Sequence, residues 1–162
     1  MKPVLFATDG SPAAAGATRT AVELAGALRA PLLVVSCWDV GYEPVGVGFA
    51  PLLPDLDRIG REQAGEIVER VADEARAAGV AAITFVRRGD PAREICALAA
   101  QRDARLIVVG SHGWGALRRL VFGSVSTGVL HHAKKPVLVV PSRPVAAVTD
   151  DRGRRVEIGD GR

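Results

Sequence analysis

The sequence predicts a single-domain α/β fold, a parallel sheet of five strands with helices on both faces. The chain of 162 residues is long enough to bury one full core. Hydrophobic residues make up 48% of it and aromatic residues only 4%, so alanine, valine and leucine must build that core. Short, almost continuously apolar runs alternate with segments of helical period. This alternation is typical of a parallel sheet that is covered on both sides.

The first half of the chain alternates strand, helix and strand. Strands are expected at Val4–Ala7 and Leu32–Cys37. The helix between them is expected to bury Ala13, Ala17, Ala21, Leu24, Ala25 and Leu28, which recur at helical spacing. The following segment, Trp38 to Asp57, is rich in glycine and proline and is predicted to be irregular.

The second half continues the alternation. The remaining strands are expected at Ala82–Val86, Leu106–Val109 and Pro136–Val140. The helices around them are expected to end at Gly79, to begin at Pro91, and to run from Ser124 to His132. Their inward positions are expected to be Ile67, Val68, Val71, Ala72 and Ala75 in the first of these helices and Ile95, Leu98 and Ala99 in the second.

Charge and cysteine content narrow the class of protein. The formal charge of +3 arises from 21 basic and 18 acidic residues, a mild excess that does not indicate nucleic-acid binding. Cys37 and Cys96 lack CxxC spacing, so neither a disulfide framework nor a zinc site is expected. No apolar run approaches the roughly 20 residues of a membrane helix, and Met1 stands directly before the first strand. We therefore expect a cytoplasmic protein without a membrane segment.

The most informative motif lies between the fourth strand and the fourth helix. Gly110, Gly113 and Gly123 are spaced Gly-x2-Gly-x9-Gly, and Ser124 follows at once. Glycine lets a ligand approach the backbone, and the first N–H groups of a helix favour an anion, so this loop is a candidate phosphate site. The alternative is that the glycines only form turns. A Walker loop and a dinucleotide fingerprint are excluded, because the loop has no Gly-Lys-Ser/Thr and Arg118 stands where the fingerprint requires glycine.

Two other loops should meet this motif. Ligands of such sheets bind at the carboxyl ends of the strands, beside the point where the strand order reverses. The segments Thr8–Ser11 and Cys37–Asp39 also follow strands. Asp9 is a candidate for binding ribose hydroxyls or a magnesium ion held by phosphate, and its alternative role is to cap the first helix.

Several segments together resemble the universal stress protein family, in its ATP-binding branch. They are the opening VLFATDGSPAAAGA, the turn at Gly89–Pro91 with Ile95 after it, the glycine motif and the closing KPVLVVP. The similarity runs from about Val4 to Pro141. It implies a doubly wound sheet in the order 3-2-1-4-5, an ATP pocket at the strand ends and a homodimer formed through the last strand. Residues 1–141 would form the nucleotide-binding domain, and residues 142–162 are expected to be a polar, mobile tail.

The resemblance assigns the phosphate-binding role to the glycine motif. Gly110 and Gly113 would line the ribose and phosphates. Gly123, Ser124 and the amide of Val125 would bind the phosphates.

The same resemblance assigns the rest of the pocket. Asp9, flanked by Thr8 and Gly10, matches the family's acidic residue after the first strand and is the candidate ligand of Mg²⁺. The backbone of Cys37 would hydrogen-bond adenine, and Val109 would lie against the ring. Family members often have His-Val where this chain has Ser36-Cys37, but a backbone contact tolerates that departure.

The function that these residues imply is ATP binding in a regulatory or stress-response protein with at most slow hydrolysis. No residue set clearly activates water or a phosphoryl acceptor. The alternative is an ATP-dependent enzyme on a related fold, a slow ATPase or an adenylate-forming enzyme, although the latter would normally need more chain for a second substrate. A phospho-receiver domain requires an acidic cluster after the first strand, an Asp at the end of the third strand and a Lys after the fifth. This chain has Asp9 alone, Arg87-Arg88 and Ser142-Arg143 there, so that interpretation fails at two of the three positions.

Other polar and aromatic residues carry weaker expectations. His112 is expected to be a loop residue, and the adjacent His131 and His132 diverge by about 100° on a helix and cannot share a metal ion. Arg118 and Arg119 either neutralise phosphate or are solvated. The irregular segment from Trp38 to Asp57 is a candidate lid over the nucleotide, and the favoured alternative is that its Trp38 and Tyr42 only pack the segment down.

Overall fold

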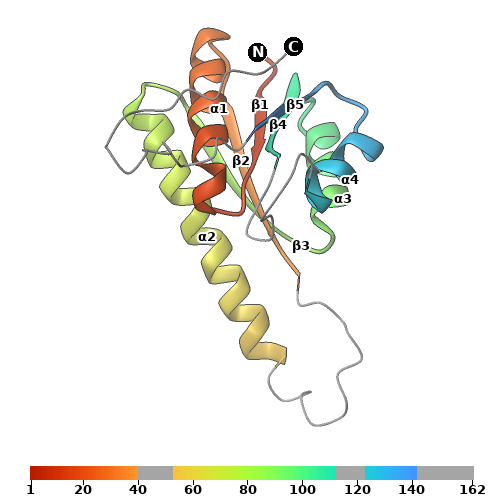
Figure 1. Ribbon diagram of the computed structural model, residues 1–162. Coiled ribbons are helices and arrows are strands. Elements are labelled where there is room, and N and C mark those ends of the chain that lie inside the picture. Colours follow the sequence, from red (N-terminus) through yellow and green to blue (C-terminus); the bar gives the residue numbers. More distant parts are fainter. Residues whose placement is uncertain (40–52, 112–122, 142–162) are drawn as a thin grey trace, which may run out of the picture.

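One sheet of five parallel strands forms the centre of the computed structural model, which describes residues 1–39, 53–111 and 123–141. The strands are β1 (Val4–Ala7), β2 (Leu32–Trp38), β3 (Ala82–Arg88), β4 (Leu106–Gly110) and β5 (Val137–Val140). They follow the order β3-β2-β1-β4-β5, as Figure 1 shows. The central strand is β1, whose Ala7 lies opposite Val35 on one side and Val109 on the other. The predicted fold class and strand order are confirmed.

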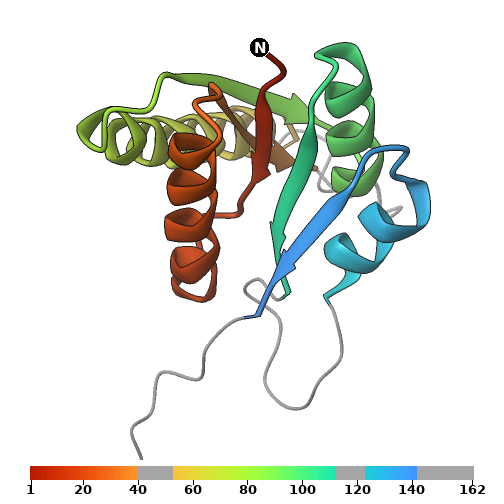
Figure 2. The ribbon, with the colours of Figure 1, turned by 90° about the horizontal axis from the view of Figure 1, so that it is seen from above.

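Helices cover both faces of this sheet (Figures 1 and 2). On one face lie α1 (Ala15–Ala27), with the short 3-10 helix η1 (Pro12–Ala14) before it, and α2 (Leu53–Ala77). On the other face lie α3 (Pro91–Gln101) and α4 (Ser124–His132). Right-handed crossovers explain the division. The chain adds β2 and β3 on one side of β1 and then β4 and β5 on the other, so the connecting helices fall on opposite faces.

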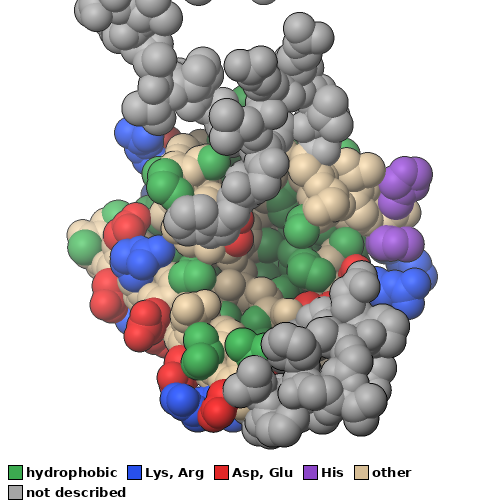
Figure 3. Space-filling view, turned by 60° about the horizontal axis from the view of Figure 1, so that its bottom comes forward, with side chains coloured by type: hydrophobic (Ala, Val, Ile, Leu, Met, Phe, Trp, Pro, Cys, Tyr) green, Lys and Arg blue, Asp and Glu red, His purple; other side chains and the backbone are tan. Residues whose placement is uncertain are grey.

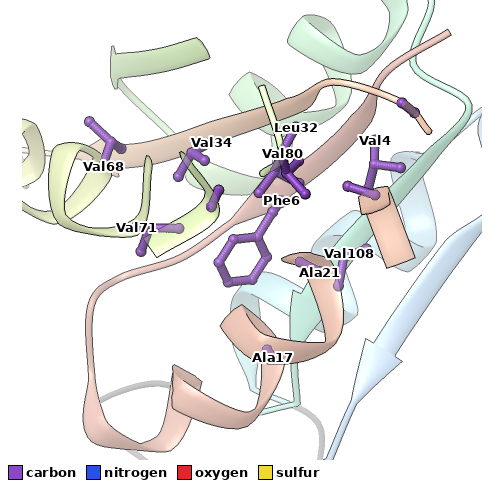
Figure 4. Close-up of a cluster of buried hydrophobic side chains, with 13 residues drawn as sticks. Val4, Phe6, Ala17, Ala21, Leu32, Val34, Val68, Val71, Val80 and Val108 are labelled. Carbon is purple, nitrogen blue, oxygen red and sulfur yellow. The ribbon is translucent and has the colours of Figure 1, made fainter. Parts of the chain in front are cut away.

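Alternate residues of β1 supply the two halves of the core. Val4 and Phe6 face α1 and α2, while Leu5 and Ala7 face α3 and α4. In Figure 4 the ring of Phe6 lies between Ala17 and Ala21 of α1 and Val71 of α2. Small alanines on α1 let this helix lie close to the sheet, and Phe6, which is fully buried, fills the space between the layers.

Inward-facing helix residues were predicted well from their spacing. Of the expected positions, Ala17, Ala21 and Ala25 of α1 are buried, as are Val68, Val71, Ala72 and Ala75 of α2 and Ile95, Leu98 and Ala99 of α3. The other four, Ala13, Leu24, Leu28 and Ile67, are only half-buried. The start of α3 has a clear local cause. The Asp90 side chain accepts a hydrogen bond of 2.8 Å from the N–H of Arg93, and Pro91 occupies the first turn.

The predicted irregular segment from Trp38 to Asp57 is wrong at both ends. Trp38 belongs to β2, where it is the register partner of Arg88, so both strands are longer than predicted. At the other end, α2 begins at Leu53. The prediction missed this start because Pro54 indicated an irregular segment. Proline is nevertheless tolerated in the first turn of a helix, where the N–H that it lacks would have no partner within the helix. Residues 40–52 lie outside the described part of the chain, as does the expected tail 142–162.

The longest helix, α2, continues past the carboxyl ends of the strands (Figure 1). Its second half covers the sheet, and its first half extends beyond the edge where the strands end. None of the helices in the described ranges combines the length and hydropathy that a membrane crossing requires.

Candidate functional site

The candidate site lies at the carboxyl edge of the sheet, between β1 and β4. These two strands are neighbours, and the chain leaves β1 toward α1 on one face and reaches α4 on the opposite face after β4. The strand order therefore reverses here, which is where ligands of doubly wound sheets bind. Figure 3 shows this edge turned forward, with hydrophobic side chains in a hollow near its centre.

Hydrogen bonds within the chain shape the turn after β1. The N–H of Thr8 donates to the carbonyl of Val35 at 3.0 Å, which holds the turn beside the end of β2. The N–H of Gly10 donates to Thr8 Oγ1 at 3.1 Å, and the N–H of Ser11 donates to Asp9 Oδ1 at 3.0 Å. Asp9 thus orders this turn with one carboxylate oxygen. The helix-capping alternative is not its role, because Ser11 and Ala14 are the capping residues of η1 and α1.

Gly10 is required by the backbone and by the packing of α2. Its φ is +70°, a conformation that favours glycine, and a Cβ there would lie 2.7 Å from Ile67 Cγ1. The guanidinium of Arg70, one turn further along α2, also lies against Gly10, with Nη2 3.0 Å from the position of that Cβ. Arg70 forms no ion pair with any other described residue. A cationic group therefore lies beside the turn that carries Asp9.

The glycine motif spans the end of β4 and the start of α4. Gly110 is the last residue of β4, and Gly123 is the N-cap of α4. The N–H of Gly123 donates to the carbonyl of Ser111 at 2.7 Å, so the two ends of the motif are joined. The hydroxyl of Ser126 donates to the Gly123 carbonyl at 2.9 Å and is 3.3 Å from that of Ser111. Gly113, between these ends, lies outside the described residues.

Backbone donors are available at the start of α4. The first intrahelical bond runs from the N–H of Thr127 to the carbonyl of Gly123, at 3.0 Å. The amides of Ser124 and Val125 precede it and have no acceptor within the helix. Both side chains are exposed. The helix dipole adds positive charge at the same place, so this end of α4 is suited to an anion.

Cys37 lies at the end of β2 and points away from α2. Its side chain packs against the cluster formed with α3 and α4. Burial raises the pKa of the Cys37 thiol to about 12, and the nearby carboxylate of Glu94 acts in the same direction. The thiol is therefore protonated at neutral pH. The backbone of Cys37 lies near the end of β2, at the carboxyl edge of the sheet.

Val109 and Ser11 are among the buried residues at this edge. Val109 is 2% exposed and belongs to the core on the α3 and α4 face. Ser11 is 4% exposed, and within the described residues its Oγ is a buried polar atom without a hydrogen-bond partner. Such an atom is uncommon and indicates a place where an additional polar group fits. The sequence predicted that the turn belongs to the site, but not that the Ser11 hydroxyl lacks a partner. It did not predict Arg70, which is distant along the chain.

Histidines and carboxylates do not form a metal centre in the described ranges, where no three candidate ligands come together. His131 and His132 lie in the last turn of α4 and are exposed (Figure 3). His112, Arg118 and Arg119 lie outside the described residues.

Comparison with known protein sequences identifies the family of this chain. A sequence model of the universal stress protein family matches residues 1–141. The chain is 34% identical to universal stress protein YxiE of Bacillus subtilis over 146 residues, covering 85% of this chain and 97% of that protein. It also matches universal stress protein Rv2005c of Mycobacterium tuberculosis at 38% identity, but spans only 44% of its length.

Solved structures agree with this relationship. Hypothetical protein MJ0577 aligns with a TM-score of 0.78 at 25% identity, over 88% of this chain and 97% of that one. A universal stress protein in complex with cAMP aligns with a TM-score of 0.63 at 26% identity, over 88% and 98%. The Archaeoglobus fulgidus universal stress protein in complex with dAMP gives 0.64 at 25% identity, over 86% and 98%.

The strand order defines a doubly wound α/β protein, a class whose ligands bind where the strand order reverses. Within that class, the chain belongs to the universal stress protein family.

Proposed function

We propose that this protein binds ATP at the carboxyl edge between β1 and β4 and acts as a regulatory module. The observation that carries the proposal is that β1 and β4 are neighbours where the strand order reverses, with the β1 turn at the end of one strand and the Gly123 cap of α4 hydrogen-bonded to Ser111 after the other. Two relatives of the same fold hold cAMP and dAMP, which indicates an adenine nucleotide as the ligand class. We propose the triphosphate in particular, because the Arg70 guanidinium on the α2 side and the free N–H groups at the start of α4 can both bind phosphate.

The phosphates would lie at the start of α4. Gly110, Gly113 and Gly123 would permit close approach of the backbone, and the amides of Ser124 and Val125 would donate to phosphate oxygens. The Ser124 hydroxyl would add one further donor. From the α2 side, Arg70 would contribute charge, since its guanidinium lies beside the Gly10 turn without an ion-pair partner in the described ranges.

The base and ribose would occupy the ends of β1 and β2. The backbone of Cys37 would hydrogen-bond adenine, with Val109 beneath the ring. Thr8, Asp9 and Gly10 would face the ribose, and the unpartnered hydroxyl of Ser11 fits an additional polar group nearby. Protein-bound Mg²⁺ often uses one or two carboxylates together with phosphate oxygens and water, so Asp9 alone is sufficient as its protein ligand. The ion would neutralise part of the phosphate charge.

A binding role fits this edge better than catalysis does. The thiol of Cys37 is protonated, and Asp9 uses one oxygen to hold its own turn. Neither is arranged as an activated nucleophile or as a base paired with one. We therefore infer regulation through the bound nucleotide, with slow hydrolysis at most.

Calorimetric titration with ATP, ADP, AMP and adenosine tests the proposal. Affinity should rise with each added phosphate, because the start of α4 and Arg70 act on phosphate rather than on the base. Mass spectrometry of the denatured, purified protein should release ATP rather than product. Equal affinity for ATP and adenosine would contradict the phosphate assignment, and absence of binding to all four would contradict the function itself.

We further propose a homodimer formed through β5, in the cytoplasm. β5 is an edge strand of apolar residues, Val137–Val140, and Leu138 at its centre is 37% exposed. An exposed edge of this kind favours pairing with a second copy. Cys37 and Cys96 are free thiols, which fits a reducing compartment.

A further inference from the structure

The inward face of α2 changes its chemistry where the sheet ends. Along the sheet this face carries the buried residues Val68, Ala72 and Ala75. Toward the N-terminus, beyond the buried Ala64, Arg61 continues this face, and Gly65, Arg58 and Glu62 lie on its flank. These last four residues line a groove of about 510 Å³ together with Trp38 and Val86. A basic and open surface thus replaces an apolar, packed one on one side of the same helix.

The indole of Trp38 forms part of this groove and is held in a fixed orientation. Alternation along β2 places it on the α2 face, opposite the side chain of Cys37. Its Nε1–H donates to Asp57 Oδ1 at 3.1 Å, and the same oxygen lies 3.1 Å from Arg88 Nε. Gly60 lies against the pyrrole part of the ring, where a Cβ would be 2.8 Å from Cδ1. The ring is therefore preorganised without a ligand.

The charges in and around the groove leave one cation without a counter-charge. Arg58 Nη1 contacts both carboxylate oxygens of Glu62, at 2.9 and 3.0 Å, so these two residues neutralise each other. Asp57 and Arg88 do the same beside the indole. Arg61 forms no ion pair within the described ranges, and Gly65 has open space where a side chain would extend. The groove therefore combines an aromatic surface, one available guanidinium and free volume.

We propose that this groove is a second binding site, for a small organic anion that carries a planar aromatic ring. The ring would lie against Trp38 and Val86, and the carboxylate would accept hydrogen bonds from the Arg61 guanidinium, whose fork matches a carboxylate. The volume lies within the range of roughly 300–1,000 Å³ that is usual for small-molecule sites. The groove differs from the candidate nucleotide site, because none of the residues that line it is assigned to the nucleotide.

The Nε1–H resonance of Trp38 provides a direct reporter of this groove. We would titrate the ATP-saturated protein with 2-naphthoate and follow this resonance by two-dimensional NMR, assigned with Trp38→Phe. Saturable shifts in the millimolar range or below are expected, with ATP remaining bound. The uncharged 2-naphthalenemethanol should bind about tenfold or more weakly, because it cannot pair with Arg61. No shift with 2-naphthoate, or displacement of ATP by it, would overturn the proposal.

Variants in the groove separate binding from folding. Arg61→Gln should weaken 2-naphthoate by about tenfold or more, whereas Arg19→Gln on the exposed side of α1 should leave it unchanged. Gly65→Leu should fill the groove and abolish binding, while Gly16→Leu on α1 serves as its control, since both glycines have open space around the Cβ position. Retention of parent affinity in both Arg61→Gln and Gly65→Leu would show that the ligand binds elsewhere.

Discussion

At the scale of single residues, Gly10 connects the candidate site to α2. Its φ of +70° requires glycine, and its missing Cβ leaves the space that Ile67 and Arg70 occupy. The sequence marked this glycine as a neighbour of Asp9. The structure adds that the same glycine lets α2 approach the β1 turn, so fold and site depend on one position.

Gly10→Ala should lower stability more than Gly79→Ala. Gly79 also has a positive φ, +77°, but open space around it, so alanine there costs only the left-handed backbone, about 1–2 kcal/mol. Alanine at Gly10 adds a contact of 2.7 Å with Ile67 Cγ1, which forces α2 to shift. Urea denaturation of both variants measures the difference. Equal losses would mean that α2 adjusts freely at this point.

Cys37 should react very slowly with iodoacetamide in the folded protein. Burial raises its pKa to about 12, so almost no thiolate is present near pH 8. Folding favours the protonated thiol, and the stability contributed by this group is therefore present below the unfolded pKa of 9.0 and falls as pH rises toward 12. Alkylation rates of Cys96→Ser, which retains Cys37, measure this directly. A rate equal to that of the unfolded chain would show that the Cys37 thiol is not protected in the folded protein.

At the scale of elements, periodicity identified the strands and the helices that pack on them. Ala17, Ala21 and Ala25 repeat every four residues and face the sheet, and α4 begins at Ser124 as predicted. The start of α2 was missed, because its first half extends beyond the sheet and its inward face is polar at Arg61. Spacing predicts a helix only where one face must be buried.

The site was predictable to the extent that it follows from strand ends. Asp9 and Gly110 both lie where a strand stops, and the strand order brings their loops together. Arg70 could not be predicted, since nothing in the sequence places it beside Gly10. The contact arises from the crossover of α2 over the sheet, and residues so distant along the chain meet only in the folded protein.

β5 is the element through which we expect two copies to associate. Leu138→Lys should convert the dimer into a monomer, because it places a charge in the centre of this edge strand. Ile83→Lys on β3, at the opposite edge of the sheet, is the matched control and should leave the dimer intact. Light scattering at high micromolar concentration distinguishes the two. A monomeric parent protein, or dissociation by Ile83→Lys instead, would contradict this arrangement.

At the scale of the whole molecule, we propose two binding surfaces at the carboxyl edge of one sheet. The β1 turn and the start of α4 form the edge that we assign to ATP. The first half of α2 and the end of β2 form the groove beside Trp38. Both surfaces depend on a sheet whose two faces are filled by separate core clusters, so a change at either edge need not disturb the fold.

Binding of ATP to Gly123→Val is the most direct test of the central claim, that the start of α4 receives the phosphates. Gly123 has φ −61° and ψ 161°, which any residue adopts, so valine there adds side-chain atoms at the N-cap of α4 without straining the backbone. Calorimetric titration with Mg-ATP, together with thermal melting, should show lost binding and a nearly unchanged melting temperature. Gly16→Val, in α1, should bind like the parent protein. Parent-like affinity for ATP in Gly123→Val would show that this glycine is only a turn residue and that the nucleotide is not bound at α4.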